Sequence, residues 1–224
     1  SEDERFFHGC RRKYSIMAHG DGPSQYDWAN YIIKPCQITA PMEDLCNQIA
    51  ELFDIDVPAH YLVYNESFKS PCFISKNFME DKHYSDFKHI FLFFNKNDLY
   101  NVQNLKEIIS QKTDSQKDIV RFIHTVLLDA LIGNNDRHGR NLGLIVSADG
   151  YRLSPTYDTV SYLAEEPLLE ADIFITGAIP TLEENTPLLG DYIKDFKRLG
   201  HESNVKDFFE RISIKKIEEL IEDS

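Results

Sequence analysis

The stretch that decides the fold is Gly133-Asn-Asn-Asp136-Arg-His138-Gly-Arg140-Asn141, followed by Ser154-Pro-Thr-Tyr157-Asp158. The first run comes directly after a strongly apolar segment with helical periodicity, and Gly133 is placed to end that helix. Two short strands are expected between the two runs, at 142–146 and 151–153. A polar loop held between rigid elements is where catalytic side chains tend to lie, so this loop is the first candidate site.

The residue types in the two runs favour phosphoryl transfer. Such a reaction needs positioning and charge compensation: one Asp orients the attacking hydroxyl, while an Asn and a second Asp hold Mg²⁺ on the phosphates. Asp136 and Asn141 have the D-x-x-x-x-N spacing of a kinase catalytic loop. Asp158 follows the predicted strand pair, where a metal-binding Asp is expected. We therefore expect Asp136 to act as the base, with Asn141 and Asp158 as metal ligands.

The first third of the chain reads as strands around one helix. Short β-branched or alternating runs predict strands near 13–17, 31–34, 61–64 and 72–75. A helix is expected after Thr39, which can cap it, and it ends near 54. Lys34 then lies at a strand end, and Glu43 lies early in the helix, so the two side chains are placed to pair. A strand lysine of this kind clamps phosphates in kinases.

The rest of the chain predicts the architecture. Residues 78–100 look irregular and aromatic-rich, a helix follows from Ser115 with Asp118 as a capping-box-like start, and the tail from about 188 is helical in three pieces. We expect an α+β, two-lobed, protein-kinase-like fold. The small β-rich N-lobe would span residues 1–80 and the mostly helical C-lobe residues 81–224.

Each residue also has an ordinary interpretation. A single Asp or Asn in a loop is more often a turn former than a catalyst. Asp158 alone could cap a helix, and His138 could be a metal ligand, although no other His lies within a few residues. The joint order of strand Lys, helix Glu, D-x-x-x-x-N and a later Asp is what favours the phosphate-transfer site.

Composition excludes several classes of protein. Of the 224 residues, 42% are hydrophobic, which suits a folded core, and the net charge of −13 argues against direct nucleic-acid binding. The basic run at residues 11–13 is either a local patch or a solvated stretch. No apolar run is long enough for a membrane span. The cysteines lack zinc or C-x-x-C spacing and predict reduced thiols in an intracellular protein: Cys10, Cys36, Cys46 and Cys72.

The motifs resemble the HipA-like serine/threonine kinases of bacteria, whose pattern is N/T-D-x-H-x-K-N followed by L-x-P-x-Y-D. Residues 135–141 and 153–158 carry this resemblance. Residues 9–13 are similar to the family's G-x-Q-x-K run at the end of its phosphate loop, 31–34 to its I-I-K strand, and Met42-Glu43 to its N-E helix start. The resemblance covers most of residues 9 to 165.

The resemblance implies ATP and Mg²⁺ as cofactors. It places Lys34 and Lys13 at the phosphates, Glu43 beside Lys34, and Phe78 near the adenine-binding hinge. It gives His138 a supporting role, orienting the loop through a hydrogen bond. It also implies a protein substrate, such as an aminoacyl-tRNA synthetase, and a toxin–antitoxin setting in the bacterial cytoplasm, with delivery into another cell as the alternative. An antitoxin or other regulatory protein is a candidate partner.

Departures from the family pattern leave other functions open. The sequence does not include the N-terminal subdomain of HipA, and in this it is similar to the short kinases called HipT. No Ser stands among residues 5–8, where the family's autophosphorylated Ser is expected. Lys76 replaces a hinge acid, and Arg140 replaces the usual Lys. A small-molecule or lipid kinase and a nucleotide-binding pseudokinase therefore remain as alternatives.

Overall fold

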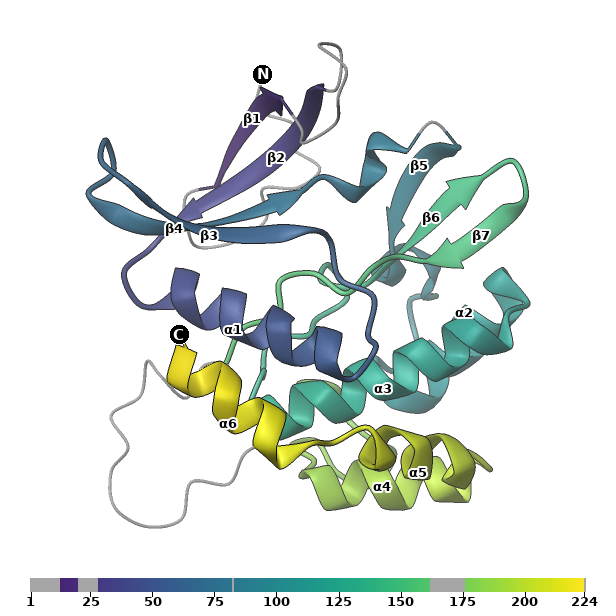
Figure 1. Ribbon diagram of the computed structural model, residues 1–224. Helices are drawn as coiled ribbons and strands as arrows, with labels where there is room; N and C mark the ends of the chain where they lie inside the picture. The colour runs from purple at the N-terminus through teal and green to yellow at the C-terminus, as the bar shows by residue number, and fades with distance from the viewer. Residues whose placement is uncertain (1–12, 20–27, 82, 162–175, 224) are drawn as a thin grey trace.

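The computed structural model of the protein describes residues 13–19, 28–81, 83–161 and 176–223 (Figure 1). A four-stranded antiparallel sheet of order β1-β2-β4-β3 forms one lobe. Helix α1 packs against β3 and β4 and lies beneath the sheet in Figure 1. The elements of this lobe are β1 (Tyr14–His19), β2 (Trp28–Pro35), α1 (Thr39–Leu52), β3 (His60–Asn65) and β4 (Ser70–Lys76).

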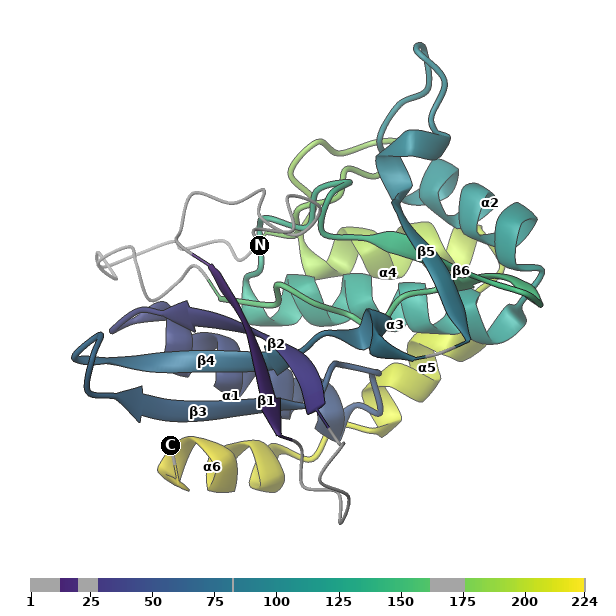
Figure 2. The same cartoon turned by 90° about the horizontal axis from the view of Figure 1, so that it is seen from above.

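The other lobe is mostly helical and carries a second, three-stranded sheet of order β5-β6-β7. Seen from above, this sheet lies beside the first one rather than over it (Figure 2). Two 3-10 turns, η2 (Phe78–Glu80) and η3 (Ile90–Phe93), flank β5 (Tyr84–His89). The remaining elements are α2 (Val102–Thr113), α3 (Gln116–Ile132), β6 (Gly143–Ser147), β7 (Gly150–Leu153), α4 (Leu189–Arg198), α5 (Glu202–Glu210) and α6 (Ile214–Asp223).

Helix α3 is the centre of the helical lobe. It packs against α2, α4 and α5, and its side chains Phe122, Ile123 and Leu127 are fully buried. The same apolar cluster includes Ala50 and Phe53 at the end of α1, so the core of the helical lobe extends to that helix. The loop that follows α3 therefore starts from a helix that is packed against three other helices.

The predicted α+β architecture is confirmed in most of its elements. The α3 helix begins where predicted, because Ser115 Oγ accepts a hydrogen bond from the Asp118 amide at 3.2 Å. It ends at Gly133, whose φ of 72° lies in the left-handed region that glycine tolerates. The hairpin β3–β4, the strand pair β6–β7 and the three helices of the tail also agree with the sequence.

Three expectations were wrong or incomplete. The segment 78–100 contains strand β5, which pairs with β6 from a distant part of the chain. Helix α2 was not predicted, although Asn101 caps it by accepting a hydrogen bond from the Asn104 amide. Thr39 is the first residue of α1 rather than its cap, and no side chain caps that helix. Within the described residues, no helix has the length and apolarity needed to cross a bilayer.

Candidate active site

A cleft lies where β2, β4 and α1 meet the loop after α3 and the segment after β7. Its empty space is about 680 Å³, open solvent at its mouth included. Six of the eight predicted site residues line it: Lys13, Lys34, Glu43, Phe78, Asn141 and Asp158. The fold thus brings together residues that are far apart in the sequence.

The charged centre of the cleft is an ion cluster. Lys34 Nζ contacts the carboxylates of both Glu43 and Asp158. Lys13 Nζ lies 3.1 and 3.0 Å from the two carboxylate oxygens of Asp158. The predicted pairing of Lys34 with Glu43 is therefore present, and Asp158 joins two ammonium groups from the sheet lobe to the helical lobe.

Burial and charge oppose each other in this cluster. Burial alone would raise the pKa of Asp158, but the ammonium groups of Lys34 and Lys13 lower it well below its ordinary value. Burial alone would lower the pKa of Lys34, but Asp158 and Glu43 raise it. For Glu43, burial prevails over the attraction of Lys34 and raises the pKa of the carboxyl. Lys34 and Asp158 are accordingly both charged at neutral pH.

The loop after α3 is closed by short-range hydrogen bonds. The main-chain oxygen of Asp136 accepts from the His138 amide at 2.8 Å and from Asn141 Nδ2 at 2.9 Å. The second bond uses the amide nitrogen of Asn141, so its side-chain oxygen is the atom suited to a metal ion. The carboxylate of Asp136 is about half exposed and does not line the cleft.

His138 supports this loop rather than lining the cleft. Its Nδ1 accepts a hydrogen bond from the Arg140 amide at 3.2 Å, and its side chain is about half exposed. Tyr157 reinforces the same loop from the other side, because its hydroxyl donates to the Arg140 oxygen at 2.8 Å. The His138 side chain is not among the residues that line the cleft, and its Nε2 lies 3.8 Å from the Asp136 carboxylate.

Phe78 lies on the segment that connects the two lobes. Its ring contacts those of Phe87 and Tyr157, with centroid distances of 5.5 and 5.6 Å. Lys76 and Asn77 line the same part of the cleft. The aromatic wall is suited to stacking against a planar base, as the hinge position predicts.

The donor set fits a magnesium ion only together with phosphate oxygens. Among the described residues, no three His, Cys, Asp or Glu side chains gather into a metal site of their own. Asn141 and Asp158 supply one amide oxygen and one carboxylate, and Mg²⁺ is commonly bound by one or two carboxylates plus substrate phosphates. The chemistry of the cleft therefore matches a metal–nucleotide pair better than a free cation.

Sequence reasoning missed Arg137 and Asp129. Both side chains are buried and paired, although arginine in a polar loop is usually exposed. A signal was present: Asp129 is an acid on the buried face of the apolar helix α3, and such a group requires a partner. Residues 5–12, which include the expected phosphate loop and most of the basic run 11–13, lie outside the described part of the chain. Cys10 is among them. Cys46 and Cys72 are buried free thiols, and Cys36 is partly buried.

Comparison with known proteins agrees with this geometry. The family described as the HipA-like C-terminal domain matches residues 7–222. The crystal structure of CtkA, a proinflammatory kinase of Helicobacter pylori, is similar with a TM-score of 0.72 at 14% identity, over 94% of this chain and 82% of that one. Among curated protein sequences, none is significantly similar.

A second solved structure is HipA of a toxin–antitoxin system of Shewanella oneidensis MR-1, in complex with HipB and its operator DNA. It has a TM-score of 0.62 at 15% identity, over 93% of this chain but only 57% of that one. At 14% and 15% identity, the two structural similarities establish the kinase-like fold and nothing about the reaction.

Proposed function

The chain belongs to the HipA-like C-terminal domain family of kinases. We propose that it is an ATP- and Mg²⁺-dependent protein kinase that acts on serine or threonine. The observation that carries the proposal is the convergence of Lys34, Glu43, Asn141 and Asp158 on one cleft. These are the side chains that phosphoryl transfer requires, in the order along the chain that a kinase uses. We assign residues 1–80 to the N-lobe and 81–224 to the C-lobe.

Each side chain has a role that its surroundings support. Bound ATP would supply the phosphoryl group, and Mg²⁺ would compensate its charge. Lys34, held by Glu43, and Lys13 would bind the phosphates; Asn141 and Asp158 would hold the metal, and Phe78 would pack against the base. Asp136, whose main-chain oxygen is bonded to the Asn141 side chain, would orient the substrate hydroxyl and accept its proton.

A protein substrate suits the position of the proposed base. Asp136 is about half exposed, so a hydroxyl on the surface of another protein can approach it. Within the proposal, the substrate is a translation component such as an aminoacyl-tRNA synthetase, and the kinase is a toxin of the bacterial cytoplasm that a partner protein restrains. The net charge of −13 would steer this chain toward a basic surface on that substrate.

One labelling experiment separates the proposed function from its alternatives. The purified chain is incubated with γ-labelled ATP, Mg²⁺ and a bacterial lysate, and the label is followed into protein and small-molecule fractions. We expect labelled protein with phosphate on Ser or Thr, and none with the variant Asp136→Asn. Label confined to a small molecule or lipid would support the other kinase classes. ATP binding without any transfer would support a pseudokinase.

A further inference from the structure

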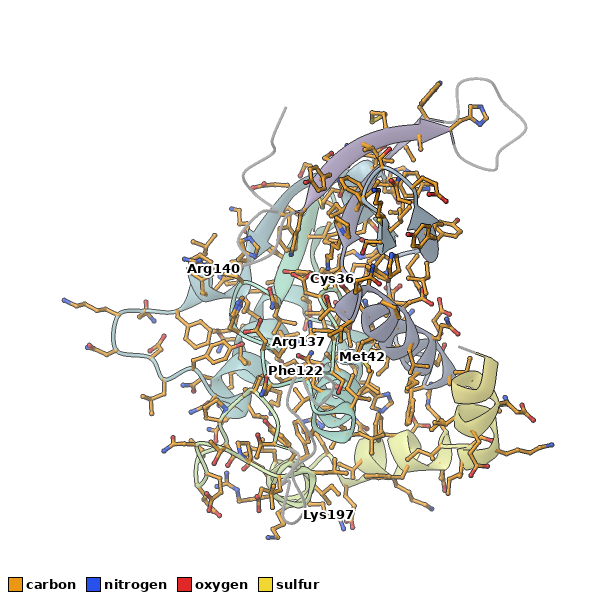
Figure 3. The ribbon with its side chains drawn as sticks, turned by 90° about the vertical axis from the view of Figure 1, so that its left-hand side faces the viewer. Cys36, Met42, Phe122, Arg137, Arg140 and Lys197 are labelled. Carbon is orange, nitrogen blue, oxygen red and sulfur yellow. The ribbon has the colours of Figure 1, made fainter. Side chains whose placement is uncertain are left out.

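A single guanidinium group lies in the interior behind the cleft. Arg137 is only 1% exposed, and Figure 3 labels it inside the molecule. A buried charge costs several kcal/mol unless it is paired and fully hydrogen-bonded. Asp129 of α3 supplies the pair, with Arg137 Nε to Oδ2 at 2.8 Å and Nη2 to Oδ1 at 2.9 Å. This two-point geometry fixes the plane of the guanidinium.

The remaining donors of Arg137 reach two other segments. Nη1 donates to the main-chain oxygen of Asn141 at 3.1 Å and to that of Tyr157. Nη2 donates to the hydroxyl of Thr159 at 3.0 Å. Arginine has five N–H donors, and all five are used here. Arg137 thus joins helix α3, the end of the catalytic loop and the segment after β7.

These contacts surround the two proposed metal ligands. Asn141 is held through its own main-chain oxygen, and Asp158 is held on both sides, through Tyr157 and Thr159. Asp158 has a φ of 51°, in the left-handed region, which most residues other than glycine rarely adopt. Such a conformation persists only where neighbouring contacts fix it. Arg137 holds the two residues beside Asp158, and Lys13 and Lys34 hold its carboxylate.

We propose that Arg137, anchored by Asp129, is a positioning residue that sets the separation of the Asn141 side-chain oxygen and the Asp158 carboxylate. The inference rests on the proposed function, because it concerns how the same site holds its metal. Arg137 acts through the backbone from behind the cleft, which it does not line. The family pattern leaves this position open, since any residue is allowed between the Asp and the His of N/T-D-x-H.

Lysine cannot replace arginine in this role. Its ammonium group has three donors on a flexible stem and lacks the planar fork that spans Asp129 and two further segments. The variant Arg137→Lys therefore keeps the buried positive charge beside Asp129 but loses the simultaneous contacts to Tyr157 and Thr159. If Arg137 only compensates the charge of Asp129, this variant should leave the metal site unchanged. If Arg137 also positions the metal ligands, the variant should alter the metal site.

The test compares Arg137→Lys with the matched control Arg121→Lys. Arg121 is a largely buried arginine that pairs with Asp56 and Asp118 and donates to the main-chain oxygens of Leu153 and Ser154 at 3.2 and 3.1 Å. None of these hydrogen bonds reaches Asn141 or the residues beside Asp158. The binding of a fluorescent ATP analogue is titrated with and without Mg²⁺, and kcat and KM are measured as a function of Mg²⁺ concentration. Thermal unfolding reports whether each variant is folded.

For Arg137→Lys we expect the Mg²⁺ concentration for half-maximal binding to rise about 10- to 100-fold, the usual cost of losing a contact behind a metal ligand. Metal-free binding should stay unchanged, kcat should fall at limiting Mg²⁺, and Arg121→Lys should keep the wild-type Mg²⁺ dependence. A folded Arg137→Lys with wild-type Mg²⁺ dependence would overturn the proposal.

If Arg137→Lys does not fold, Thr159→Val serves as the second variant, because it removes one acceptor beside Asp158 and conserves volume. A shift of the Mg²⁺ requirement in the same direction supports the proposal, and no shift overturns it. Failure of the proposed function has a different signature: wild-type protein would transfer no phosphate, while the Mg²⁺-dependent binding would still report on Arg137.

Discussion

At Asp158, backbone and side chain are constrained together. Its φ of 51° is tolerated better by Asp and Asn than by other non-glycine residues, and its carboxylate lies between the ammonium groups of Lys13 and Lys34. The variant Asp158→Asn therefore removes the charge without adding backbone strain. It leaves the two lysines facing each other with Glu43 as their remaining counter-charge.

We expect Asp158→Asn to lower the free energy of unfolding by about 2 kcal/mol at neutral pH, less than for a fully buried pair because 23% of the Asp158 side chain is exposed. The pKa of Asp158 is lowered on folding, so its stabilisation is present above the ordinary value of 3.8 and is lost as pH falls below it. Urea unfolding of both proteins from about pH 7 to pH 2 measures this. A stability difference that stays constant down to the lowest pH would contradict the assignment.

Asp136 differs from Asp158 in exposure and in expected effect. The variant Asp136→Asn should lower the rate of phosphoryl transfer by about 10²- to 10⁴-fold, because the side chain can no longer accept a proton. ATP binding should be unchanged, since the carboxylate does not line the cleft. Single-turnover kinetics and nucleotide titration measure the two effects. Asp149→Asn, an exposed acid in the β6–β7 turn, is the control, and full activity in Asp136→Asn would refute its role as base.

At the scale of elements, α3 determines where the catalytic loop begins. Ser115 satisfies the amide of Asp118 at its start, and Gly133 ends it with a left-handed residue. Ser115→Ala should lower the free energy of unfolding by about 1 kcal/mol, because an amide at the helix start loses its acceptor. Chemical denaturation measures the loss, and Ser115→Asp should restore most of it. An equal loss in the exposed control Ser67→Ala would show that the cap is not its cause.

At the scale of the whole molecule, the C-terminal helices fix the helix that carries Glu43. Phe208 of α5 stacks on Phe53 at the end of α1, with ring centroids 4.7 Å apart. Arg211, between α5 and α6, donates to Asp54 Oδ2 at 2.9 Å and to the Phe53 oxygen at 3.3 Å. Helix α6 itself packs along α1, as Figure 1 shows. The position of Glu43 in the cleft thus depends on residues near the end of the chain.

The Arg211 bridge gives a prediction about salt. Arg211→Met should lower the free energy of unfolding by up to about 1 kcal/mol at low ionic strength, because the bridge is partly exposed and its charges are screened by solvent. The difference from wild type should shrink at about 1 M NaCl, where the Debye length falls to about 3 Å. Urea unfolding at both salt concentrations measures it. If the difference in the free energy of unfolding does not change with salt, Arg211 stabilises the protein through packing rather than through its charge.

The sequence by itself determined the features that depend on neighbours along the chain. Ser115 and Gly133 bound α3, residues 147–150 turn one strand into the next, and the D-x-x-x-x-N spacing marks the loop that we propose to be catalytic. Each of these follows from hydrogen bonds and backbone preferences over a few residues. The strand order β1-β2-β4-β3 and the presence of β5 do not follow from such local preferences, because strand pairing joins distant segments of the chain.

Only the tertiary structure decided how the site is held. Lys13 and Lys34 meet Asp158 across 145 and 124 residues of sequence, and the strengths of those contacts depend on burial that no local pattern encodes. In the sequence, Arg137 is not distinguishable from other polar loop residues. In the folded chain, its side chain is buried and paired with Asp129. A charge that is solvated in an open loop becomes, in a low-dielectric interior, a group that must satisfy every donor it has, and here those donors reach Asn141 and the two residues beside Asp158.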